Sequence, residues 1–262
     1  MDIKILVATH KKYWMPDDDV YLPLHVGREG KADLGYIGDN TGDNISAKNA
    51  NYCELTGLYW AWKNLECDYI GLCHYRRYFA KNLFLFRFAK YLYLDKVEKI
   101  VLSKMIYKNL LIKYDIILPK KWRLDKMNIY SQYKLEHNIH DLDECFKIIC
   151  ELYPEYFKTC QTVCNRREMY ICNMFVTKKS IFDEYMEWLF DILFTLEKRI
   201  DISSYDSYQA RVYGFLSERL FNVWLEKNKN NLNIKEMPVI FLENKQLITF
   251  IKEKIKNFLN YE

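Results

Sequence analysis

Residues 44–81, NISAKNANYCELTGLYWAWKNLECDYIGLCHYRRYFAK, predict a helix followed by a buried strand that ends in polar groups. Apolar side chains recur with helical spacing over residues 51–64: Leu55, Leu58, Tyr59 and Trp62. Residues 68–73 form a short apolar run, as in strands covered on both faces. Four polar or aromatic residues follow: His74, Tyr75, Arg76 and Arg77. Ligands of open α/β sheets bind at the carboxyl ends of strands, so this cluster is predicted to be a binding site.

The remaining pattern predicts an α/β chain with one domain over residues 1–262. Further strands are expected at residues 3–8, 20–26, 114–119, 169–177 and 239–242, and helices at 128–150, 179–199 and 208–226. The core is expected to end near residue 226, with an amphipathic basic extension over 227–262. Residues 82–113 are apolar and basic, which indicates a packed helix pair. For this segment and the extension, contact with an anionic membrane surface is the alternative.

Charge and cysteine usage place the chain in the cytoplasm and argue against nucleic-acid binding. The net charge is only +4, and 39 basic residues are spread evenly among 35 acidic ones. The eight cysteines include no CxxC pair, as expected for thiols in a reducing compartment. The sequence shows no signal peptide and no apolar run long enough for a transmembrane helix. Peripheral contact with the inner face of the cytoplasmic membrane stays open.

The order of strand, glycine-rich loop, helix, strand and polar cluster is typical of nucleotide-sugar transferases. Most of these enzymes place an Asp-x-Asp pair and a divalent cation against the donor diphosphate. This chain instead has two guanidinium groups, which attract phosphate with bidentate geometry. We therefore predict that Arg76 and Arg77 bind the leaving diphosphate, the alternative being that one of them forms a structural ion pair. If Mn²⁺ or Mg²⁺ is bound, His74 is the candidate ligand.

A second group of residues is predicted to contact an acceptor. Asn173 is the one polar residue in an apolar strand, so it is either a structural clip or a ligand contact. His137 and His140 lie close together on a helix with Asp141, where a metal site is the alternative. Arg211 is a charged member of the last long helix.

Four segments carry a resemblance to a known family: NISAKNANYCELTGLYWAWKN, IGLCHYRRYF, ICNMFVTKK and GFLSERL. They resemble the bacterial capsule, exopolysaccharide and O-antigen glycosyltransferases first grouped as a domain of unknown function of the DUF4422 type. The resemblance implies a GT-A-like fold, a Rossmann-type mixed sheet flanked by helices with a helical C-terminal part. It also implies inverting transfer of a sugar, such as galactofuranose or galactose, from a UDP-sugar to a lipid-linked oligosaccharide.

The same resemblance suggests donor contacts near the glycine-rich loop. The Ser-Ala-Lys-Asn sequence at residues 46–49 is similar to the Ala-Arg-Asn turn of inverting GT-A enzymes. By that likeness Lys48 and Asn49 contact the nucleotide, and Thr9 and His10 line the uracil side. The chain departs from the wider GT-A pattern in lacking Asp-x-Asp, which leaves the metal open.

Inverting transfer needs a general base, and the sequence offers three carboxylates. Glu218 and Asp206 follow the predicted strand at residues 169–177, and Glu54 lies on the helix facing the site. A salt bridge from Glu218 to Arg211 or Arg219 is an equal alternative. Two non-enzyme classes are also considered: a binding module for single-stranded nucleic acid, and a catalytically degenerate scaffold in a polysaccharide assembly complex.

Overall fold

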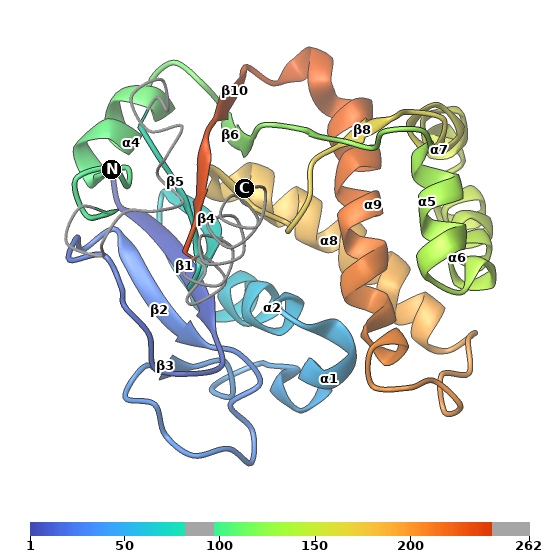
Figure 1. Ribbon diagram of the computed structural model, residues 1–262, viewed down its shortest axis with the longest axis horizontal. Helices are drawn as coiled ribbons and strands as arrows, with labels where there is room; N and C mark the ends of the chain where they lie inside the picture. The colour runs from blue at the N-terminus through green and yellow to red at the C-terminus, as the bar shows by residue number, and fades with distance from the viewer. Residues whose placement is uncertain (82–96, 243–262) are drawn as a thin grey trace, which may run out of the picture.

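The computed structural model describes residues 1–81 and 97–242, and these form a mixed sheet flanked by helices (Figure 1). The described strands of the main sheet are β1 (Ile3–Thr9), β2 (Tyr21–His25), β3 (Ile37–Gly38), β4 (Tyr69–His74), β5 (Arg77–Phe79), β6 (Ile116–Pro119), β9 (Phe175–Lys178), β10 (Ile234–Met237) and β11 (Val239–Phe241). A separate small ribbon pairs β7 (Trp122–Arg123) with β8 (Glu168–Met169).

The strand order of the main sheet is β10-β6-β9-β4-β1-β2-β3, with β5 and β11 attached beside β4. β1 pairs in parallel with both β2 and β4, and β9 runs antiparallel to its neighbours β4 and β6. The carboxyl ends of β1 and β4 therefore meet at one edge, where Ala8 is opposite His74. The predicted α/β class with a mixed sheet is confirmed.

Helices cover both faces of this sheet. The described helices are α1 (Asn49–Tyr52), α2 (Leu55–Asn64), α4 (Lys104–Leu111), α5 (Ile129–Glu136), α6 (Ile139–Leu152), α7 (Phe157–Cys164), α8 (Lys179–Glu197) and α9 (Val212–Asn228). Figure 1 shows α5, α6 and α7 lying together at the right, beside α9. None of the helices within the described ranges is long and apolar enough to cross a membrane.

Side-chain alternation along β1 divides the core into two layers. Leu6 and Ala8 belong to the cluster that includes α2, α8 and α9, whereas Ile5 and Val7 belong to the cluster that includes α4. This division follows from the two-residue period of a strand. β1 is thus buried on both faces, which explains its continuous apolar sequence.

Three predicted elements are interrupted in the structure. The helix expected over residues 51–64 breaks at Cys53, which has a φ of 53°. The helical region 128–150 divides into α5 and α6, because the Asn138 side chain caps α6 by accepting from the backbone N–H of His140 at 3.2 Å. The prediction of one strand over residues 169–177 is wrong for its middle part. The chain bends there between β8 and β9, and Cys172 and Asn173 have φ values of 67° and 51°.

Two strands lie in the described part of the C-terminal region. β11 confirms the strand expected at residues 239–242, whereas β10 was not predicted, and the two join the main sheet by pairing with β5 and β6, respectively. The remainder of the extension, residues 243–262, and the first part of the predicted helix pair, residues 82–96, lie outside the described residues. The expectations for those two segments stay predictions.

Candidate active site

A cavity of about 690 Å³ opens where β1 and β4 end. Its walls come from the ends of these strands, from the glycine-rich loop, from α1, from α9 and from the bend that precedes β9. The lining includes Thr9, His10, Lys31, Asn49, Cys53, Glu54, His74, Tyr75, Arg77, Cys172, Arg211 and Glu218. We call this space the donor cavity, because most of the residues predicted to contact a sugar donor line it. It occupies the position at which open α/β sheets bind ligands.

One wall of the donor cavity is aromatic. The rings of His10 and Tyr75 meet edge to face with centroids 5.3 Å apart, and Tyr13 packs on the other side of Tyr75 at 5.2 Å. Burial, followed by nearby lysines and Arg76, lowers the pKa of His10, so its ring is neutral at pH 7. A neutral ring pair of this kind fits a planar, uncharged group such as a nucleobase.

Cationic side chains line another part of the cavity. Arg77 stands at the start of β5, Lys31 on the glycine-rich loop and Arg211 in the turn Gln209–Arg211 before α9. Within residues 1–81 and 97–242, no salt bridge joins any of these three to a carboxylate. Their charge therefore fits an anionic ligand such as a diphosphate.

Arg76 does not line the donor cavity. Its guanidinium carbon lies 4.9 Å from the ring centroid of Tyr75 and 5.7 Å from that of Tyr13, which places it against the aromatic wall. Its Nε atom is buried without a hydrogen-bond partner in the described structure. The predicted pair of arginines is thus divided between two positions: Arg77 faces the cavity and Arg76 supports its wall.

The backbone of one residue, Cys172, ties the two ends of the site together. The backbone N–H of Cys172 donates to Oε1 of Glu218 at 2.8 Å, and its carbonyl oxygen lies 2.8 Å from Nε2 of His74. A carbonyl can only accept, so Nε2 of His74 carries the hydrogen and Nδ1 keeps a lone pair in the neutral ring. Burial lowers the pKa of His74, which favours this neutral form.

Two carboxylates reach the cavity: Glu218 from α9, and Glu54 from the break between α1 and α2 rather than from a helix as predicted. Burial raises the pKa of Glu218, and the nearby charge of Glu54 raises it further. Glu54 is positioned by Asn173, whose Nδ2 donates to Oε1 of Glu54 at 2.9 Å and to the Ser217 hydroxyl at 2.9 Å. Asn173 is buried, and these bonds make it a clip between α9 and Glu54.

Asp39 organises the glycine-rich loop, and sequence reasoning did not identify it. It is fully buried and accepts from the backbone N–H groups of Gly27 and Arg28 at 2.7 and 3.0 Å. It also accepts from the Thr56 hydroxyl at 2.6 Å and from the Ser46 hydroxyl. One carboxylate thereby fixes the loop to α2.

Gly27 allows Asn49 to reach the cavity. Its φ is 62°, and a Cβ placed there would lie 2.3 Å from Cγ of Asn49. The Asn49 side chain is held in this position because its Nδ2 donates to the carbonyl of Cys53 at 2.7 Å. The loop and the α1 turn can approach this closely only without a side chain at residue 27.

The chain can now be compared with known proteins. The model of a family described as a domain of unknown function, DUF4422, matches residues 4–229. The chain belongs to this family. It is also similar to the apo structure of the bifunctional glycosyltransferase WbbM, with 36% sequence identity and a TM-score of 0.87. That match covers 93% of this chain and 46% of the other, so this chain spans less than half the length of its neighbour. No curated protein matches the chain.

These comparisons confirm two predictions made from the sequence. The DUF4422 family is the one that the four motifs resemble, and the likeness to a glycosyltransferase structure supports the predicted GT-A-like fold. In this member of the family, the structure brings eleven residues predicted as site residues together or into contact with one another, namely Thr9, His10, Asn49, Glu54, His74, Tyr75, Arg76, Arg77, Asn173, Arg211 and Glu218.

Three further residues predicted for the site lie elsewhere. Lys48 forms an ion pair with Glu197, with Nζ 2.6 Å from Oε2, and is not among the cavity-lining residues. Asp206 is exposed and caps the turn before α9 by accepting from the backbone N–H groups of Tyr208 and Gln209, each at 2.8 Å. His140 is exposed on the first turn of α6. Their predicted roles are not supported by contact with the donor cavity.

His137 lines a second groove of about 720 Å³, and Glu218 lines both this groove and the donor cavity. The Nδ1 atom of His137 lies 3.1 Å from Oε1 of Gln209, and its ring stacks on Phe215 with centroids 4.0 Å apart. No three His, Cys, Asp or Glu side chains in the described parts of the chain are arranged to hold a metal ion.

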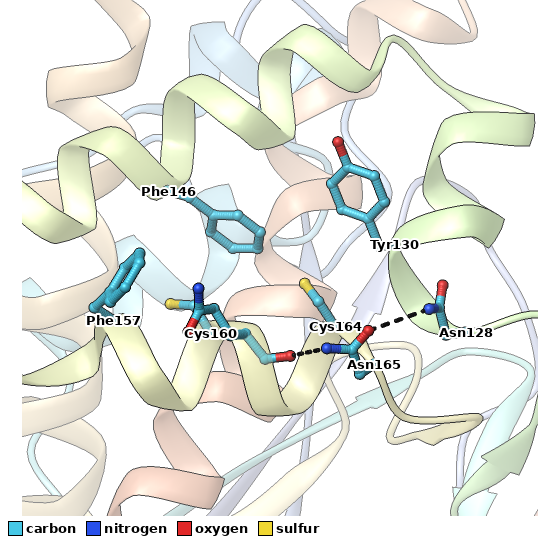
Figure 2. A pocket seen from close by; sticks show the side chains of 8 residues that line it. Asn128, Tyr130, Phe146, Phe157, Cys160, Cys164 and Asn165 are labelled. Atoms are coloured by element: carbon cyan, nitrogen blue, oxygen red, sulfur yellow. Dashed lines mark hydrogen bonds between the residues drawn. The ribbon is translucent and has the colours of Figure 1, made fainter.

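Another pocket, of about 490 Å³, lies between α5, α6 and α7 (Figure 2). Phenyl rings, thiols and amides line it, including Phe146, Phe157, Cys160 and Asn165. Among the described residues, no charged side chain contributes to its lining. The pocket therefore lacks the groups that a nucleotide diphosphate requires.

Proposed function

We propose that this protein is an inverting glycosyltransferase that moves a sugar, such as galactofuranose or galactose, from a UDP-sugar to a lipid-linked oligosaccharide. Capsule, exopolysaccharide or O-antigen synthesis is the setting that we propose for this reaction. The observation that carries the proposal is the donor cavity, which combines an aromatic wall, three cationic side chains and a carboxylate held by a backbone amide. The similarity to WbbM, described as a bifunctional glycosyltransferase, supports it.

In the proposed complex the nucleobase packs against His10 and Tyr75, near Thr9 and Asn49. The diphosphate then lies toward Arg77, with Lys31 and Arg211 on the remaining sides of the cavity. Guanidinium groups stabilise the charge that develops on the leaving nucleotide when the sugar–phosphate bond breaks.

Glu218 is our candidate for the general base. Its carboxylate accepts the proton of the acceptor hydroxyl while that oxygen bonds to the anomeric carbon. The bond from the anomeric carbon to the phosphate oxygen breaks at the same time, and its electron pair leaves with UDP. A carboxylate with a raised pKa is a stronger base than an ordinary glutamate. Glu54 is the second candidate.

We propose that side chains of the protein neutralise the donor diphosphate, and Mn²⁺ or Mg²⁺ is the alternative. His74 Nδ1 keeps a lone pair that could coordinate a cation. However, the described residues supply no cluster of three ligands, whereas three cationic side chains line the cavity. The side chains that line the cavity therefore fit a diphosphate better than they fit a metal ion.

A thermal-shift panel with UDP, GDP, CMP, dTDP and UDP-sugars, each in EDTA and in manganese, tests the proposal. A ligand at 100 times its dissociation constant stabilises the folded protein by about 2.7 kcal/mol. Stabilisation by UDP in EDTA supports metal-free binding, and stabilisation only with manganese assigns a metal to the site. No response to any nucleotide refutes donor binding. UDP binding without turnover of any UDP-sugar would instead indicate a degenerate scaffold.

A further inference from the structure

The groove beside the donor cavity has walls from the β7–α5 segment, β8, the turn before α9 and α9 itself. Its lining includes Trp122, Asp125, Gln132, His137, Tyr208 and Glu218. We call it the acceptor groove. Its volume of about 720 Å³ lies within the roughly 300–1,000 Å³ typical of ligand sites.

Two large aromatic side chains of this groove are exposed. Trp122 and Tyr208 are 57% and 52% accessible to solvent, although aromatic rings usually bury most of their surface. The Tyr208 ring packs on Phe215 at 5.1 Å, and Phe215 in turn stacks on His137. The Tyr208 ring is thus supported from behind, and both rings have surface open to a ligand.

Polar groups lie between these rings, and their charges are mixed. Arg123, Lys126 and Arg219 are accompanied by Asp125, Glu136 and Glu218 along the same groove. A polyanion would meet repulsion from the three carboxylates, so the lining does not favour nucleic acid or a second diphosphate. A neutral ligand with apolar faces and hydroxyl edges matches both the rings and the polar groups.

We propose that the acceptor groove binds the saccharide part of the acceptor, with its ring faces on Trp122 and Tyr208 and its reacting hydroxyl at Glu218. This inference rests on the proposed glycosyltransferase function. Glu218 carries the argument because it lines both the acceptor groove and the donor cavity. A general base must contact the acceptor hydroxyl at the point where this hydroxyl attacks the sugar donor. A carboxylate at the junction of the two sites meets this requirement.

The test uses an array of bacterial surface saccharides and the labelled full-length protein with UDP present. Saccharides that bind are titrated against Trp122→Ala, Trp122→Phe and Tyr208→Ala. Phe157→Ala is the matched control, because Phe157 is 47% exposed in the pocket of Figure 2, which shares no lining residue with the acceptor groove. Stabilisation by UDP is recorded for every variant as a check that it folds.

Loss of one stacking ring should weaken saccharide binding by roughly two- to tenfold. The conservative Trp122→Phe variant should recover part of this loss, and Phe157→Ala should bind like the wild type. Wild-type affinity for saccharide in both Trp122→Ala and Tyr208→Ala overturns the inference. The inference is also overturned if no saccharide on the array binds while UDP still stabilises the protein. Absence of UDP stabilisation is a separate result, which overturns the proposed function itself. Preferential binding of an oligonucleotide or peptide at Trp122 also refutes a saccharide site.

Discussion

Replacement of Arg77 by alanine should weaken UDP binding far more than replacement of its neighbour Arg76. Arg77 lines the donor cavity, and a charge-assisted hydrogen bond contributes about 1.5–3 kcal/mol. Its loss should therefore raise the dissociation constant for UDP by roughly tenfold to 150-fold. Arg76 only supports Tyr75, with its guanidinium 4.9 Å from the ring centroid. A cation–π contact is worth about 0.5–1 kcal/mol, so Arg76→Ala should cost roughly two- to fivefold.

Isothermal titration calorimetry with UDP in EDTA measures both variants under the same conditions. Arg77→Lys is a useful third variant, since lysine keeps the charge but loses the bidentate geometry, and its affinity should be intermediate. Unfolding midpoints are measured in parallel to show that each variant is folded. Equal losses in Arg76→Ala and Arg77→Ala, or wild-type affinity in a folded Arg77→Ala protein, would refute the assignment of Arg77 to the diphosphate.

Three further predictions concern the base and the loop that shapes the cavity. Glu218→Gln should slow sugar transfer by about 10²- to 10⁴-fold. The wild-type rate should fall as the pH decreases through a pKa above the usual glutamate value, because the reaction requires the ionised base. A pH–rate profile that Glu218→Gln leaves unchanged contradicts this assignment. Asp39→Ala should lower the free energy of unfolding in urea by roughly 3 kcal/mol or more, because each donor left unsatisfied costs about 1–3 kcal/mol. Gly27→Ala should lower the melting temperature more than Gly30→Ala, since both have positive φ but only the former meets Asn49; equal shifts would exclude the clash.

The sequence was sufficient for the parts of the site that follow strand ends. β1 and β4 are continuous apolar runs, and parallel pairing brings Thr9 and His74 to one edge whatever the loops do. The division between Arg76 and Arg77 did not follow from the sequence, because Arg76 lies in the turn between β4 and β5, where the two-residue period of a strand does not apply.

Other features depend on contacts between distant segments. Cys53, Cys172 and Asn173 adopt positive φ angles, which local propensity disfavours for the two cysteines. Contacts such as the bond from the Cys172 N–H to Glu218 hold this conformation in the folded chain. Asp39 was missed for a similar reason: in sequence it lies in a polar turn, and its burial arises only when α2 covers it.

The bond between the Cys172 peptide and Glu218 has a consequence for how the protein is made. Residues of the aromatic wall such as His10 leave the ribosome early. Glu218 belongs to α9, which emerges after nearly the whole described sheet has been synthesised. A nascent chain that has emerged only as far as β9 therefore lacks the carboxylate that fixes the Cys172 bend, and it also lacks Arg211. Domains generally fold as units during synthesis. Because α9 also contributes to the core that packs on β1 and α2, the cavity is complete only when α9 docks.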